Sequence, residues 1–125
     1  MNILYVNHYA GSVRHGMEYR PVYLAREWRR LGRSGVIVNF SSPGAVRAHH
    51  NEPLYDATKA GVEALSRAMA GQLGPHGIRV NCVSPASIGD DADRRPDLPM
   101  RRAIRPSDVA NGVLYLASDA AARVT

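Results

Sequence analysis

The residues Gly35-Val-Ile-Val-Asn-Phe-Ser-Ser42 give the clearest indication of how this chain folds. Its first six residues form a mostly apolar run, which is typical of a strand buried on both faces of a parallel sheet. Two further short apolar runs, Ile3–Val6 and Ile78–Val83, predict additional strands. A long helix is predicted for Tyr55–Leu73, where Gly74-Pro75 ends it. Strands that alternate with helices indicate a parallel sheet with right-handed crossovers.

Two more helices complete the predicted fold. One begins at Pro21, a residue suited to a first turn, and ends near Gly32. The other is expected to have Ser107 as its N-cap and to run to about Ser118. The segment 86–106 is predicted to be a polar loop rich in Asp and Arg. The fold class is therefore α/β, a truncated Rossmann-like sheet of three parallel strands flanked by helices on both faces.

Length and composition exclude several classes of protein. A chain of 125 residues holds one modest core, and it has no apolar run near the roughly 20 residues that span a bilayer. The single cysteine, Cys82, excludes an internal disulfide and is expected to be a buried apolar residue. No signal peptide is apparent at the start of the chain, so we expect a cytoplasmic protein. The first 35 residues are basic and aromatic, but no nucleic-acid-binding motif accompanies them, so nucleic acid is not an expected partner.

Three residues form the candidate catalytic site. Tyr55 and Lys59 are four apart on the predicted helix and share one face, and Ser42 follows the buried strand. Parallel sheets place their working residues beyond the carboxyl ends of the strands, so Ser42 should lie beside the first turn of that helix. A free phenol ionises near pH 10, and a nearby ammonium stabilises its phenolate. The set suits proton transfer to a carbonyl oxygen, which Ser42 can hold by a hydrogen bond. The alternative is that Tyr55 only packs and Lys59 is simply solvated.

The sequences around these residues resemble the C-terminal half of a short-chain dehydrogenase/reductase. The matching stretches are GVIVNFSSPGA, YDATKAGVEALSRAMAGQLGPHGIRVNCVSP and RPSDVANGVLYLASDAAARVT, within residues 35–125. The resemblance implies a doubly wound sheet, NAD or NADP as cofactor, and a small carbonyl or alcohol substrate. It implies that Ser42 polarises the carbonyl, that Tyr55 donates or accepts the proton, and that Lys59 bonds the nicotinamide ribose. Pro85 and Ile88 match the family's cofactor-binding motif after the third strand, beside Tyr55 and Lys59 as cofactor contacts.

Several departures from that family pattern predict weak cofactor binding and an impaired enzyme. The segment Gly11–Gly16 does not match the family's glycine-rich phosphate loop. No counterpart is found for the asparagine that takes part in the family's proton relay. In the motif after the third strand, Ala86 replaces a glycine and Asp90 replaces a threonine, and the Asp90 charge would repel a diphosphate. The chain also stops at Thr125, where the family continues into a last strand.

Residues 1–32 resemble a different family, the N-terminus of two-Rossmann-domain glycosyltransferases that act on nucleotide sugars. We therefore expect two segments in one compact domain, a glycosyltransferase-like βα unit over 1–34 and a dehydrogenase half-domain over 35–125. The main alternative function is a nucleotide-sugar glycosyltransferase fragment. A further alternative is a non-catalytic remnant that only oligomerises.

The predicted long helix and the strand edges favour a homo-oligomer. Its apolar residues are expected to cover the sheet: Val62, Leu65, Met69 and Leu73. Small residues on its other positions would let a second helix approach, and unpaired strand edges invite a second copy. No metal site is predicted, because His49-His50 has no ligand partners at suitable spacing and is expected to be a surface loop.

Overall fold

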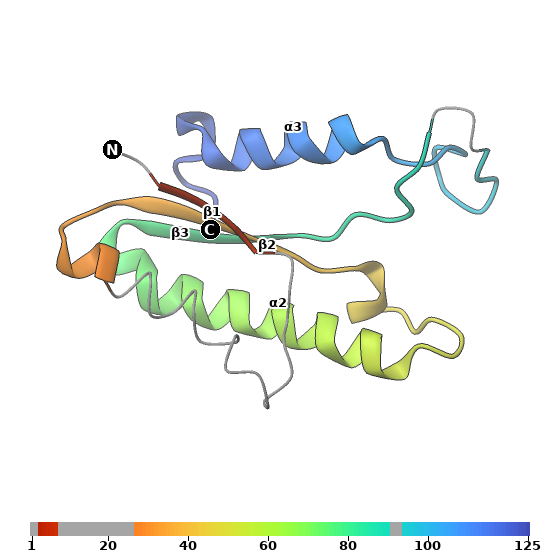
Figure 1. Cartoon of the computed structure of the whole chain (residues 1–125), viewed down its shortest axis with the longest axis horizontal. Coiled ribbons are helices and arrows are strands. Elements are labelled where there is room, and N and C mark those ends of the chain that lie inside the picture. Colours follow the sequence, from red (N-terminus) through yellow and green to blue (C-terminus); the bar gives the residue numbers. More distant parts are fainter. Residues whose placement is uncertain (1–2, 8–26, 91–93) are drawn as a thin grey trace.

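The computed structural model describes residues 3–7, 27–90 and 94–125 (Figure 1). Its sheet has three parallel strands in the order β1-β2-β3: β1 is Ile3–Asn7, β2 is Gly35–Phe40 and β3 is Ile78–Val83. Ile3 pairs with Gly35 at the start of the first ladder, and Gly35 pairs with Ile78 at the start of the second. The predicted parallel sheet is confirmed, with β1 one residue longer than expected.

Two helices cover opposite faces of this sheet (Figure 1). They are α2, Pro53–Leu73, and α3, Pro106–Ala117. Short 3-10 helices lie at the connections: η2 is Pro43–Ala45, η3 is Gly74–His76 and η4 is Asp119–Ala121. α2 begins two residues earlier than predicted because Pro53 occupies its first turn, where a missing N–H costs nothing.

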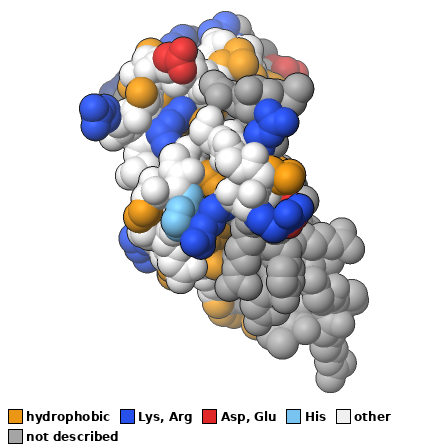
Figure 2. Space-filling view, turned by 90° about the vertical axis from the view of Figure 1, so that its left-hand side faces the viewer, with side chains coloured by type: hydrophobic (Ala, Val, Ile, Leu, Met, Phe, Trp, Pro, Cys, Tyr) orange, Lys and Arg blue, Asp and Glu red, His pale blue; other side chains and the backbone are white. Residues whose placement is uncertain are grey.

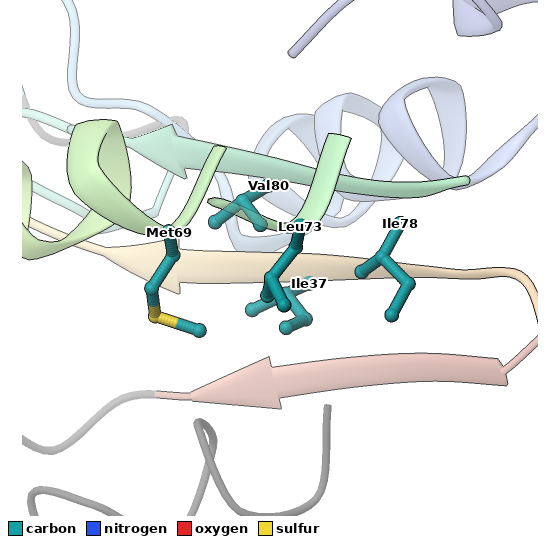
Figure 3. Close-up of a cluster of buried hydrophobic side chains, with 5 residues drawn as sticks. All are labelled: Ile37, Met69, Leu73, Ile78 and Val80. Carbon is teal, nitrogen blue, oxygen red and sulfur yellow. The ribbon is translucent and has the colours of Figure 1, made fainter. Parts of the chain in front are cut away.

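The alternation of side chains along β2 builds a core on each side of the sheet. On the α2 side the buried cluster contains Ile37, Met69, Leu73, Ile78 and Val80 (Figure 3). On the α3 side it contains Val36, Val38 and Val113. Burial of each large aliphatic side chain stabilises the fold by about 1.5–3 kcal/mol. The prediction that β2 is buried on both faces is confirmed.

The buried stripe of α2 differs from the predicted one at one position. Its members alternate three and four residues apart: Lys59, Val62, Ser66, Met69 and Leu73. Leu65 is 37% exposed and lies off the stripe, so the prediction that it covers the sheet is wrong. Ser66 occupies the buried position instead, because its hydroxyl both donates and accepts a hydrogen bond there. It donates to Val62 O at 2.7 Å and accepts from Asn39 Nδ2 at 2.9 Å.

Two further expectations need correction. The N-cap of α3 is Arg105, not Ser107, because Pro106 occupies the first turn and Asp108 Oδ2 accepts a hydrogen bond from Arg105 N at 3.1 Å. Cys82 is half-buried instead of buried, and desolvation raises the pKa of its thiol.

The segments that connect the strands and helices include a helix stop that the sequence predicts. Residues 27–30 are helical and Gly32 follows them at φ +64°, as expected for a helix stop, while the predicted helix before residue 27 lies outside the described residues. Between β3 and α3, the chain folds back on itself through backbone bridges that pair Ile88 with Ile104 and Arg94 with Arg102. Within the described ranges, the helices are too short or too polar to cross a membrane.

Candidate active site

Ser42 is positioned by the carboxyl end of β2. The ladder continues one residue beyond the strand, because Ser41 N donates to Val83 O at 2.8 Å. Ser42 is buried, and its Oγ accepts a hydrogen bond from Gly44 N at 3.3 Å in η2. Accepting this bond leaves the hydroxyl hydrogen of Ser42 available for another acceptor.

Lys59 ties α2 to the same end of β2. Its side chain is only 7% exposed, and its Nζ donates to Phe40 O at 3.0 Å. Ser41 Oγ donates in return to Lys59 O at 3.1 Å. Burial of an ammonium is costly unless polar groups contact it, and the Phe40 carbonyl supplies one such group. The interpretation of Lys59 as a simply solvated cation is therefore wrong.

Tyr55 lies one helical turn before Lys59, at the surface. It is 43% exposed, and Lys59 Nζ lies 5.6 Å from the centre of its ring, within cation–π range. The ammonium therefore lies close to the Tyr55 ring, while the effect of Lys59 on the phenolic oxygen stays a prediction. Tyr55 can meet a ligand from solvent while Lys59 remains beneath it.

A His–Asp pair beside Tyr55 was not predicted from the sequence. Asp56 Oδ1 lies 2.7 Å from His49 Nδ1, and Asp56 Oδ2 accepts from His49 N at 2.7 Å. The backbone N–H of His49, and then its ring, hold the pKa of Asp56 below its ordinary value. The ring centres of His49 and Tyr55 are 6.1 Å apart. His49 was expected to be only a surface-loop residue, because nothing in a spacing of seven residues predicts this pairing.

Gly44 accommodates the His49–Asp56 pair. A Cβ on Gly44 would overlap the carboxylate of Asp56 and lie 2.5 Å from His49 Nδ1. The absence of a side chain therefore lets η2 pack against the first turn of α2. Because Gly44 also donates to Ser42, one short segment connects Ser42 with the surroundings of Tyr55. The expectation that Ser42 lies beside the first turn of this helix is confirmed.

The predicted cofactor residues follow β3. Pro85 is half-buried and Ile88 is exposed, two residues before the exposed Asp90. The backbone around Ile88 is fixed, because Ile104 N donates to Ser87 O at 2.9 Å and Gly89 N donates to Ile104 O at 3.0 Å. Cofactor contact by Pro85 and Ile88 stays a prediction. The segment Gly11–Gly16 lies outside the described residues.

The opposite end of the sheet carries a different feature. A cavity of about 500 Å³ opens where β2 and β3 begin, lined among others by Gly35, Ile78, Arg79 and Arg123. Figure 2 looks at this end of the molecule, where basic side chains outnumber acidic ones. The cavity is separated from Tyr55 by the length of the strands and does not belong to the candidate active site. Within residues 27–90 and 94–125, no three His, Cys, Asp or Glu side chains gather as a metal site would require.

Known proteins share this architecture. A short chain dehydrogenase from Bacillus anthracis superimposes with a TM-score of 0.85 at 27% identity, covering 98% of this chain and 59% of that one. A sequence model described as Enoyl-(Acyl carrier protein) reductase matches residues 19–125. The chain belongs to the short-chain dehydrogenase/reductase family. A family member from Leptospira borgpetersenii, solved with bound NAD+, has a TM-score of 0.79 at 28% identity and covers 98% of this chain and 60% of its own.

Relatives of known activity match only in part of their length. D-erythrulose reductase of Gallus gallus is 36% identical over 114 residues, 82% of this chain and 46% of that protein. The chain thus spans about half the length of this short-chain dehydrogenase/reductase relative. The family match begins at residue 19 and the structural matches cover 98% of the chain, so both cross the predicted boundary at residues 34–35. None of these three proteins is a glycosyltransferase, and the likeness of residues 1–32 to that family stays a prediction.

Proposed function

We propose that this chain carries the proton-transfer side of an NAD(P)-dependent oxidoreductase that interconverts a small carbonyl compound and its alcohol. The observation that carries the proposal is the placement of Tyr55 at the surface with the buried Lys59 ammonium 5.6 Å from its ring centre. Membership of the short-chain dehydrogenase/reductase family supports it. The relative named as a D-erythrulose reductase supports a small hydroxylated substrate.

The residues divide the chemistry between them. In the reducing direction, Tyr55 gives its phenolic proton to the carbonyl oxygen of the substrate. Lys59 stabilises the phenolate that remains, because an ammonium close to a phenol favours its ionised form. Ser42 donates its free hydroxyl hydrogen to the same substrate oxygen and fixes its position. In the oxidising direction each transfer is reversed.

The residues present fit the nicotinamide end of NAD or NADP. Lys59 donates to Phe40 O, and an ammonium has three N–H donors, so further donors are available for ribose hydroxyls. Pro85 and the exposed Ile88 would offer apolar surface to the nicotinamide. The cofactor supplies or accepts the hydride when it is bound. We expect its affinity to be low and activity to be weak, because Asp90 carries a negative charge that would repel the diphosphate of the cofactor.

The test compares initial rates of NADH and NADPH oxidation with a small hydroxyketone. Tyr55→Phe should lower the rate by about 100-fold or more, since a general acid contributes roughly 10²–10⁴. Tyr115→Phe is the matched control, because Tyr115 is also exposed but lies on α3. Equal rates in wild type and Tyr55→Phe would overturn the proposal. Binding of a nucleotide sugar, unchanged in Tyr55→Phe, would favour the glycosyltransferase alternative instead.

A further inference from the structure

The His49–Asp56 pair has a defined hydrogen-bonding arrangement. Asp56 accepts from the backbone N–H and faces the ring of His49, and these contacts keep the pKa of its carboxyl low. An ionised carboxylate has no hydrogen to donate, so the hydrogen between the two groups belongs to His49 Nδ1. The second ring nitrogen, Nε2, is then the atom that can take up or release a proton.

The imidazole of His49 lies beside Tyr55 at the surface of the protein. The His49 side chain is 42% exposed, whereas Asp56 is 13% exposed. The His49 ring centre lies 6.1 Å from that of Tyr55 with the two rings tilted by 55°, so the imidazole and the phenol are neighbours at the surface. α2 brings three ionisable groups to this arrangement, Asp56, Tyr55 and the buried Lys59, and the loop that carries His49 also holds Arg47, His50 and Glu52. The other element against it, η2, contributes Pro43–Ala45 and therefore no ionisable side chain.

We propose that His49 is the residue through which Tyr55 exchanges its proton with water. This inference rests on the proposed function. After reduction of a carbonyl, the doubly protonated His49 ring gives its Nε2 proton to the Tyr55 phenolate, so that the Nε2–H bond breaks as the phenolic O–H bond forms and the ring becomes neutral. Nε2 then takes a proton from water, and Nδ1–H stays with Asp56 throughout. No electron is transferred in these steps, and one proton from water replaces the one delivered to substrate.

Three other features of the chain support this role for His49. No asparagine occurs between Asn7 and Asn39, so the sequence holds no counterpart of the relay asparagine before β2. Lys59 is buried and bonded to Phe40 O, and so has little contact with water of its own. His49 combines exposure to solvent with a ring contact to Tyr55, and Asp56 fixes its orientation.

The first experiment uses ¹⁵N NMR of histidine side chains and needs no cofactor. We expect His49 in its neutral form to be the Nδ1–H tautomer, and Asp56→Asn to produce a tautomer mixture. Tyr55→Phe should shift the His49 Nε2 resonance. His50, the exposed neighbour, is the internal control and should not respond to either change. The proposal would be overturned if neutral His49 in the wild type were the Nε2–H tautomer. It would also be overturned if Tyr55→Phe left the chemical shift of His49 Nε2 unchanged.

The second experiment measures turnover. His49→Gln should lower kcat by about 10–100-fold with little change in KM, and added imidazole should restore part of the loss. His50→Gln should leave kcat unchanged. Normal turnover in His49→Gln, or a loss that imidazole does not restore, would overturn the role of His49 while the proposed function stands. Absence of any turnover in wild type would overturn both.

Discussion

Replacement of Gly44 by alanine tests whether the packing of η2 against α2 is as close as the structure shows. The new Cβ would overlap the Asp56 carboxylate and lie 2.5 Å from His49 Nδ1, and 2.7 Å from His49 Cε1. Either the pair must move or the backbone of η2 must withdraw from α2. Overpacking of this kind costs about 1–3 kcal/mol, which corresponds to a fall in Tm of roughly 4–12 °C for a domain of this size.

The assay is thermal unfolding followed by circular dichroism, with Gly112→Ala as the matched control. Gly112 lies within α3, and a Cβ there would meet nothing within 4 Å. Because alanine favours the helix, Gly112→Ala should stabilise the protein by about 0.5–1 kcal/mol. A Gly44→Ala protein as stable as wild type would refute the close contact between η2 and the His49–Asp56 pair.

Three further predictions concern the cofactor, self-association and acid stability. Calorimetry should give a Kd for NADPH weaker than micromolar, because the negative charge of Asp90 would repel the cofactor diphosphate; micromolar binding would contradict this. Sedimentation velocity at micromolar concentration should show dimers or larger species, since the small residues of α2 would let the same helix of a second copy approach closely; a cooperative 13.6 kDa monomer would count against it. Hydrogen bonds from Arg95 and Arg105 lower the pKa of Asp97 and Asp108 respectively. The unfolded chain therefore binds more protons than the folded chain near pH 4. The two ion pairs stabilise the fold fully above that pH, and this stabilisation is lost as pH falls through the lower pKa values of the folded state. Unfolding measured from pH 2 to 6 should depend less on pH in Asp108→Asn than in wild type, and an identical dependence would argue against this assignment.

The strands and the long helix follow from local patterns in the sequence. Apolar runs bounded by turn residues predict β2 and β3 with their observed limits, because burial on both faces demands continuous hydrophobicity. The stripe of α2 is harder to predict, because Leu65 is more apolar than Ser66 but lies on the wrong side of the helix. Ser66 is tolerated in the interior only because Asn39 and Val62 satisfy its hydroxyl, and those contacts depend on the tertiary fold.

Some residues of the candidate site could likewise be predicted from local patterns in the sequence, and others could not. Tyr55 and Lys59 are found by helical spacing, and Ser42 by the rule that chemistry gathers beyond the carboxyl ends of strands. The pairing of His49 with Asp56 joins a loop to a helix across seven residues, so no periodicity predicts it. The His49–Asp56 pair requires a glycine at position 44, but glycines are so common in loops that Gly44 alone does not predict a contact.

Mass spectrometry can follow the transfer of deuterium from a 4-deuterated reduced nicotinamide to a small hydroxyketone, and so reports hydride transfer by this chain. Label accumulates over long incubations, so the experiment detects even the slow reaction that weak cofactor binding implies. We expect the wild-type chain to place deuterium on the former carbonyl carbon. The rate of deuterium incorporation should fall at least about 100-fold in Tyr55→Phe but not in Tyr115→Phe. No label with wild type, or equal label with Tyr55→Phe, would contradict the assignment of Tyr55 as the proton-transfer residue of this chain.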